Sequence, residues 1–123
     1  MQLLDVVLLQ SDPSTMQSLV ALLRNHFRSV RHAESLDDLR TSAAKRRAEV
    51  AILDMEAISL LDLKALSDEF PAVSIICNHR LADDAMWAVA LSAGAADCCP
   101  SYDTRGILRS AVRHAPRARS MAA

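Results

Sequence analysis

One carboxylate stands out because it ends an otherwise apolar segment. Residues 50–53 are all apolar, and Asp54 follows them directly. Residues 3–9 form a second, largely apolar segment, which three polar residues follow: Gln10, Ser11 and Asp12. A carboxylate at such a strand end can ligate a hard cation, which prefers oxygen ligands, or accept hydrogen bonds from loop amides. Asp12 also precedes Pro13, as an N-terminal helix cap does, so its carboxylate has a structural explanation.

The three cysteines are the other reactive side chains. Cys77 and Cys98 fall on neighbouring predicted strands, where they could approach each other, and a redox role for this pair stays open. Cys98 and Cys99 are adjacent, so on a strand they point to opposite faces and cannot bind one metal ion there. No histidine falls at ligand spacing, and buried free cysteines are usually inert. We therefore expect no metal site.

Charged residues form a third pattern. The segment 104–114 carries a basic stripe with the spacing of one helix face, and acidic residues lie in the elements before it. The stripe is Arg105, Arg109 and Arg113, and the acidic residues are Asp83, Asp84 and Asp97. Opposite charges on one face can set the register and the choice of a partner. A solvated helix with cations near its C-terminus explains the same stripe, so both interpretations stay open.

The elements that position these residues alternate between strands and helices. Predicted strands cover residues 3–9, 28–32, 50–53, 72–77 and 96–99, and predicted helices start at 13, 36, 59, 82 and 104. This alternation implies a parallel sheet with right-handed crossovers and helices on both faces. We expect the α/β class, as a flavodoxin-like (βα)5 doubly wound parallel sheet with strand order 2-1-3-4-5. That order brings residues 10–12 and Asp54 to one switch point.

Composition bounds the class of protein. The chain has 123 residues, of which 51% are hydrophobic and 24% charged, so it suits one globular domain and is not a disordered chain. A net charge of −1 and an aromatic content of 3% disfavour nucleic-acid binding. No apolar segment approaches the roughly 20 residues that span a bilayer. We expect a cytoplasmic protein without membrane contact, with residues 1–115 as its domain and 116–123 as a flexible C-terminal tail.

With these elements in place, the sequence resembles the receiver domains of two-component response regulators over residues 2–114. Residues 7–13 resemble the first strand and acidic loop of that family, and residues 51–54 resemble the strand that ends in its phospho-acceptor aspartate. Residues 93–97 match its Ala-Gly-Ala-x-Asp motif. The resemblance implies Asp54 as the phospho-acceptor candidate, a role in phosphorelay signal transduction, and an interaction face on the fourth helix, fifth strand and fifth helix.

The sequence departs from the family at the other functional positions. The acidic pair that holds Mg²⁺ aligns with Gln10 and Ser11, which are neutral, and the phosphate-binding lysine aligns with Ser101. The switch hydroxyl aligns with Cys77 and the switch aromatic residue with Cys98. Because Mg²⁺ prefers carboxylate oxygens, we expect weak Mg²⁺ binding at most, and no other cofactor.

We interpret the chain as a stand-alone, atypical receiver, or pseudo-receiver, that acts as a protein-interaction module and not as an enzyme. The expected partner is another protein or a second copy of the chain, bound through the face named above. Two alternatives stay open: a functional receiver phosphorylated on Asp54, and a flavodoxin-like domain that binds flavin or another small ligand. The second alternative needs a phosphate-cradling loop, which neither Gly94 nor Gly106 opens.

Overall fold

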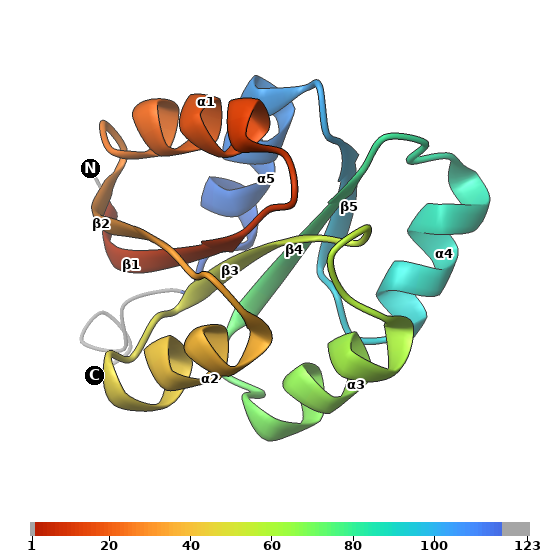
Figure 1. Cartoon of the computed structure of the whole chain (residues 1–123), viewed down its shortest axis with the longest axis horizontal. Coiled ribbons are helices and arrows are strands. Elements are labelled where there is room, and N and C mark those ends of the chain that lie inside the picture. Colours follow the sequence, from red (N-terminus) through yellow and green to blue (C-terminus); the bar gives the residue numbers. More distant parts are fainter. Residues whose placement is uncertain (1, 117–123) are drawn as a thin grey trace.

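The computed structural model describes residues 2–116 and contains a five-stranded parallel sheet (Figure 1). The strands are β1 (Gln2–Leu9), β2 (Phe27–His32), β3 (Val50–Asp54), β4 (Ser74–His79) and β5 (Asp97–Pro100). They pair in the order β2-β1-β3-β4-β5. The predicted α/β class and flavodoxin-like strand order are therefore confirmed. The predicted C-terminal tail, apart from Pro116, lies outside the described residues.

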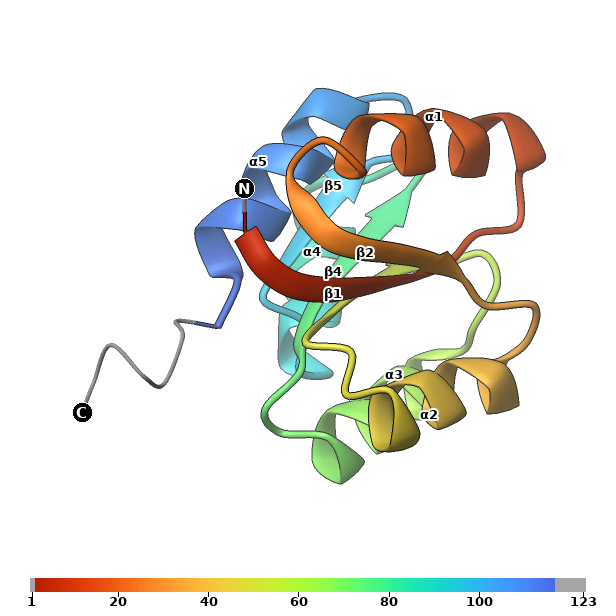
Figure 2. The same ribbon diagram turned by 90° about the vertical axis from the view of Figure 1, so that its left-hand side faces the viewer.

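Within residues 2–116, four helices connect the strands, a fifth follows β5, and together they cover both faces of the sheet. They are α1 (Pro13–Leu23), α2 (Leu36–Lys45), α3 (Leu60–Glu69), α4 (Asp84–Ser92) and α5 (Thr104–His114). Each begins after a side chain that accepts a hydrogen bond from a backbone amide of the first turn, which satisfies a donor without a helical partner. These caps are Asp12, Ser35, Ser59, Asp83 and Asp103. Helices α1 and α5 pack on one face, and α2, α3 and α4 pack on the other (Figure 2).

Alternation along β1 divides the core into two layers. Val6 and Leu8 pack with α1 and α5, whereas Val7 and Leu9 pack on the side of α2 and α3. Strand β3 is buried over its whole length, as its continuous apolar sequence predicts. Because Leu9 and Leu53 belong to the second layer, the residues that follow them, Gln10 and Asp54, continue the first layer at the carboxyl edge of the sheet.

Strand β4 begins and ends two residues later than predicted, at 74–79 instead of 72–77. Its start is delayed because the Val73 amide donates a hydrogen bond to the Phe70 carbonyl in the turn after α3. Its end is extended because Asn78 pairs in register with Asp54 of β3. The sheet therefore includes polar residues that the apolar pattern alone leaves out.

A helix crosses a membrane only if it is both long enough and apolar enough. Within residues 2–116, no helix is both long and apolar enough to cross a membrane.

Among the residues that the structure describes, two have a positive φ, and substitutions at these two positions should change stability in opposite directions. Gly94 follows α4 with a φ of 112°, and a Cβ at this position would collide with the Ser67 side chain of α3. Gly94→Ala should therefore lower the free energy of unfolding by about 2 kcal/mol, through backbone strain and the collision. Urea denaturation followed by circular dichroism measures the change. The exposed Ser92→Ala at the end of α4 is the control, and equal midpoints for the two variants would contradict this account.

Arg47 has a φ of 55° at the end of α2, where glycine is the usual residue. Arg47→Gly should raise the free energy of unfolding by about 0.5–1 kcal/mol, because left-handed strain of about 1–2 kcal/mol is relieved at a smaller entropic cost. The neighbouring Arg46 has a φ of −99°, so Arg46→Gly should lower stability and serves as the matched control. Urea denaturation measures both changes. A loss of stability in Arg47→Gly would show that the backbone of Arg47 is not strained.

Candidate functional site

The carboxylate of Asp54 joins the loops that follow β1 and β3. Asp54 is 4% exposed, and its Oδ2 accepts a hydrogen bond from the Ser11 amide at 3.1 Å and another from the Ser11 hydroxyl. Its Oδ1 accepts a hydrogen bond from the Glu56 amide at 2.9 Å. Hydrogen bonds to a carboxylate are stronger than those between neutral groups and offset part of the cost of burying its charge. Both carboxylate oxygens are thus occupied by the protein itself.

A reciprocal pair of side-chain amides spans the end of β3. The Gln10 amide nitrogen donates to Asn78 Oδ1 at 2.7 Å, and the Asn78 amide nitrogen donates to Gln10 Oε1 at 3.0 Å. Gln10 is 8% exposed and Asn78 is fully buried. Gln10 follows β1 and Asn78 lies on β4, so the pair bridges the two strands that flank β3. It is electrically neutral.

The amide pair extends to the loop after β5. The Asn78 amide nitrogen also donates to the Ser101 hydroxyl oxygen at 2.8 Å. Asn78 therefore joins Gln10 to Ser101. Both residues are among the predicted site residues, and Ser101 is the one that aligns with the family's phosphate-binding lysine. We call Gln10, Asn78 and Ser101 the amide network. Its members use neutral donors and acceptors only.

Asn78 is the residue that sequence reasoning missed. The predicted strand ended at Cys77, so the switch position was assigned to that cysteine. In the structure Cys77 is fully buried in the opposite layer, with Leu53 and Leu63, and Asn78 is the residue on the side of Asp54. A signal was present: Asn78 is the first polar residue after the apolar segment of β4, as Asp54 is after that of β3.

The thiols lie in the core. Cys98, the predicted equivalent of the switch aromatic residue, belongs to the same layer as Cys77 and contacts the Met55 sulfur at 3.7 Å. Burial raises the pKa of the Cys98 thiol to about 11 and that of Cys99 to about 12, and it raises the pKa of Cys77 further. Since the thiolate is the reactive form, these thiols are poorly suited to redox chemistry or metal binding.

Asp12 acts as the cap of α1. Its Oδ2 accepts hydrogen bonds from the Thr15 amide at 3.0 Å and the Thr15 hydroxyl at 2.7 Å, and these bonds lower the pKa of Asp12. Among the three polar residues after β1 (Gln10, Ser11 and Asp12), Asp12 has the one carboxylate, and it caps α1 instead of joining Asp54. In the part of the chain that the structure describes, no three His, Cys, Asp or Glu side chains form a group that could hold a metal ion.

An ion pair connects the loops after β3 and β4. The Arg80 side chain and backbone amide donate to Glu56 Oε1 at 2.9 and 3.3 Å. Because the Glu56 amide also binds Asp54, this pair fixes the loop beside the carboxylate.

Asp97 connects α4, β5 and α5. Its carboxylate accepts hydrogen bonds from the Ser110 hydroxyl at 2.6 Å, the Cys98 amide at 2.8 Å and the Trp87 indole at 3.2 Å. Burial raises the pKa of Asp97, but the hydrogen bonds from Ser110, Cys98 and Trp87 outweigh it, so the net shift is downward. Asp97 is therefore committed to holding the three elements together.

The other predicted face residues are more exposed. Asp83 caps α4 by accepting a hydrogen bond from the Met86 amide at 2.8 Å, and Asp84 is exposed in the first turn. Arg105, Arg109 and Arg113 are exposed, and no carboxylate of residues 2–116 lies within 4.0 Å of them. Arg109 and Arg113 border an open hollow of about 400 Å³ whose lining includes Asp97 and Ser110.

Comparison with known proteins finds the fold but no relative by sequence. No family model matches the chain, and no curated protein matches it. Among solved structures, the N-terminal signal receiver domain of a two-component response regulator from Bacteroides fragilis has a TM-score of 0.83 at 21% identity, over 95% of this chain and 100% of that chain. The signal receiver domain of the putative response regulator NarL from Mycobacterium tuberculosis has a TM-score of 0.77 at 18% identity, over 92% and 96%.

A longer protein shares the same fold. The RcsB response regulator of Salmonella typhimurium, described for its interaction with DNA, has a TM-score of 0.79 at 18% identity. The match covers 92% of this chain but only 59% of the RcsB chain. Together with the strand order and the position of Asp54, these similarities show that the chain has the receiver-domain fold of two-component response regulators.

Proposed function

We propose that this chain is an atypical receiver that acts as a protein-interaction module without Mg²⁺-dependent phosphorylation of Asp54. The observation that carries the proposal is the neutral amide network of Gln10, Asn78 and Ser101 beside Asp54. A phosphoryl group adds about two negative charges, which need a cation and positively charged donors to balance them. The amide network supplies neither.

The surroundings of Asp54 support this proposal. Its oxygens are already hydrogen-bonded to Ser11 and Glu56, and the carboxylate of Asp12 is used in the cap of α1. Mg²⁺ requires near-octahedral oxygen coordination and is usually held by more than one carboxylate or by phosphates. Glu56 is the nearest other acidic residue along the chain, and its carboxylate pairs with Arg80. The alternative, phosphorylation on Asp54, would require these contacts to be broken.

The proposed interaction surface is the face formed by α4, β5 and α5. Its support is the basic stripe on α5, which has no ion-pair partner among residues 2–116, together with exposed apolar side chains on α4 and α5, of which Trp87 is 47% and Val112 is 36% exposed. Exposed ion pairs contribute only about 0–1 kcal/mol each, so an apolar centre must supply the remaining affinity. Without a modification to shift an equilibrium, the conformation that binds must already be the populated one. The free thiols support a cytoplasmic location.

Addition of Mg²⁺ and then beryllofluoride should leave the amide resonances around Asp54 unchanged at millimolar concentrations. The reason is that the acidic residues nearest to Asp54 along the chain are already engaged, since Asp12 caps α1 and Glu56 pairs with Arg80. A ¹H–¹⁵N correlation spectrum of the full chain measures this, with Asp54→Asn as the control for any weak surface binding of the ion. Saturable shifts at residues 10–12 and 54–56 that disappear in Asp54→Asn would overturn the proposal.

Charge reversal on α5 should weaken assembly. Arg109→Glu with Arg113→Glu should reduce self-association or partner binding about tenfold, because both side chains lose their attraction to acidic groups and gain repulsion. Sedimentation velocity measures the self-association. Lys45→Glu with Arg46→Glu, which changes the net charge equally on exposed residues at the C-terminal end of α2, is the matched control. Asp54→Asn should behave as the unmodified chain, and altered assembly in Asp54→Asn alone would contradict a phosphorylation-independent role.

A further inference from the structure

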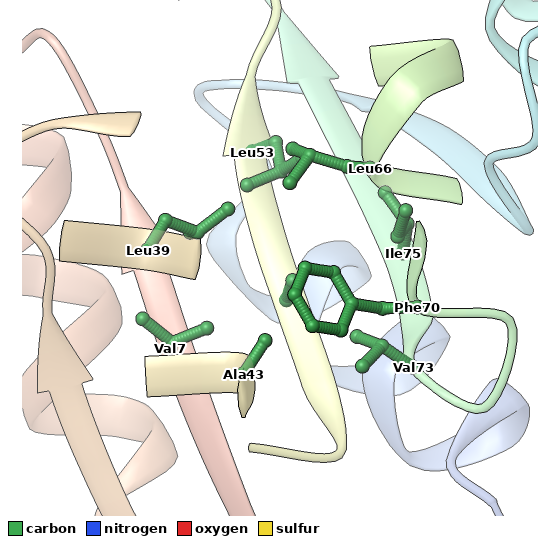
Figure 3. Close-up of a pocket in the computed structure, with 9 residues that line it drawn as sticks. Val7, Leu39, Ala43, Leu53, Leu66, Phe70, Val73 and Ile75 are labelled. Carbon is green, nitrogen blue, oxygen red and sulfur yellow. The ribbon is translucent and has the colours of Figure 1, made fainter. Parts of the chain in front are cut away.

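A small apolar void lies between α2, α3 and the sheet. Its volume is about 10 Å³, and its lining comes from apolar side chains of β1, α2, β3, α3, β4 and the turn before β4 (Figure 3). A void of this size has room for about one water molecule, but a cavity without polar partners stays dry. The void is therefore an unfilled part of the core.

An open groove of about 350 Å³ adjoins this void. The two share three residues, Ala43, Phe70 and Val73, so the same side chains line both. The ring of Phe70 lies across β3 and points toward α2 (Figure 3). Because Phe70 is the residue just after α3 and is only partly buried, a change of its rotamer can join the groove to the void.

The groove carries one unpaired positive charge. Of its two charged residues, Glu69 accepts a hydrogen bond from Arg40 at 3.0 Å, so its charge is neutralised. Arg47 is exposed, and none of the carboxylates of residues 2–116 lies within 4.0 Å of it. Arg47 also has the left-handed backbone described above, which glycine would adopt at lower cost. The chain thus places a guanidinium at the groove at the expense of backbone strain, a pattern associated with functional sites.

We propose that this groove binds a small anionic amphiphile, with its carboxylate on Arg47 and its apolar tail over Phe70 toward the void. Arginine suits this head group because its planar guanidinium matches a carboxylate with two parallel hydrogen bonds. At about 30 Å³ for each non-hydrogen atom, the volume that a water molecule occupies in the liquid, the groove takes roughly a dozen such atoms. A carboxylate with a chain of about eight carbons fits this limit. The site is independent of the function proposed above, because it lies at the amino-terminal end of the strands.

Three matched ligands test the proposal on the full chain. Octanoate, octan-1-ol and octylammonium share one tail and differ in the charge of the head. Octanoate should give saturable shifts at the amides of Ala43, Phe70 and Val73 in a ¹H–¹⁵N spectrum. The alcohol should bind about tenfold more weakly, and octylammonium should bind more weakly still. Equal affinity for octanoate and octanol, or shifts spread over the surface without saturation, would overturn the proposal.

Substitutions separate the head from the tail. Arg47→Gly should weaken octanoate binding about tenfold although the protein becomes more stable. Arg47→Lys should weaken it by a smaller factor, because the charge remains but the two parallel hydrogen bonds are lost, and Arg46→Gly should leave it unchanged. Ala43→Leu should fill the space beside Phe70 and abolish binding, and Ala44→Leu, on the exposed neighbour, should not. Because Arg47→Gly is expected to fold more stably, lost binding there cannot be attributed to unfolding. Unchanged binding in either Arg47→Gly or Ala43→Leu refutes the site.

Discussion

The carboxyl edge of the sheet depends on the pair of amides that Gln10 and Asn78 exchange across β3. Where several acidic groups converge on a site, their mutual repulsion must be balanced by a bound cation. Here the amides satisfy each other at 2.7 and 3.0 Å, and Asp54 lies beside them because it pairs in register with Asn78. The orientation of Asp54 then follows from Ser11 and Glu56, which bind its two oxygens.

Strand β5 is held by side chains at both of its ends. Asp97, its first residue, binds Trp87 of α4 and Ser110 of α5, and Ser101, just after its last residue, binds Asn78. A strand fixed in this way has little freedom to shift relative to its neighbours. Switching proteins need an element with two discrete arrangements of similar energy. The contacts of β5 favour one arrangement, as the proposed phosphorylation-independent binding requires.

The sequence predicted more of the fold than of the site. Strand order, the cap residue Asp12 and the burial of β3 follow from patterns that span several residues. Asn78 was missed because a polar residue at the end of a strand looks like the start of a loop until its hydrogen-bond partners are known. Asp97 was predicted as a surface charge, yet its three donors come from three different elements. Such contacts depend on tertiary placement, which local patterns do not encode.

The separation of the two amides along the chain has a consequence for the order of folding. Gln10 and Asn78 are 68 residues apart, and β3 lies between their strands. Their hydrogen bonds can form only after β1, β3 and β4 have assembled, so we expect them among the later contacts. Late contacts act mainly on the rate of unfolding and little on the rate of folding. We therefore expect the amide pair to slow unfolding, which lengthens the lifetime of the native state, without speeding its formation.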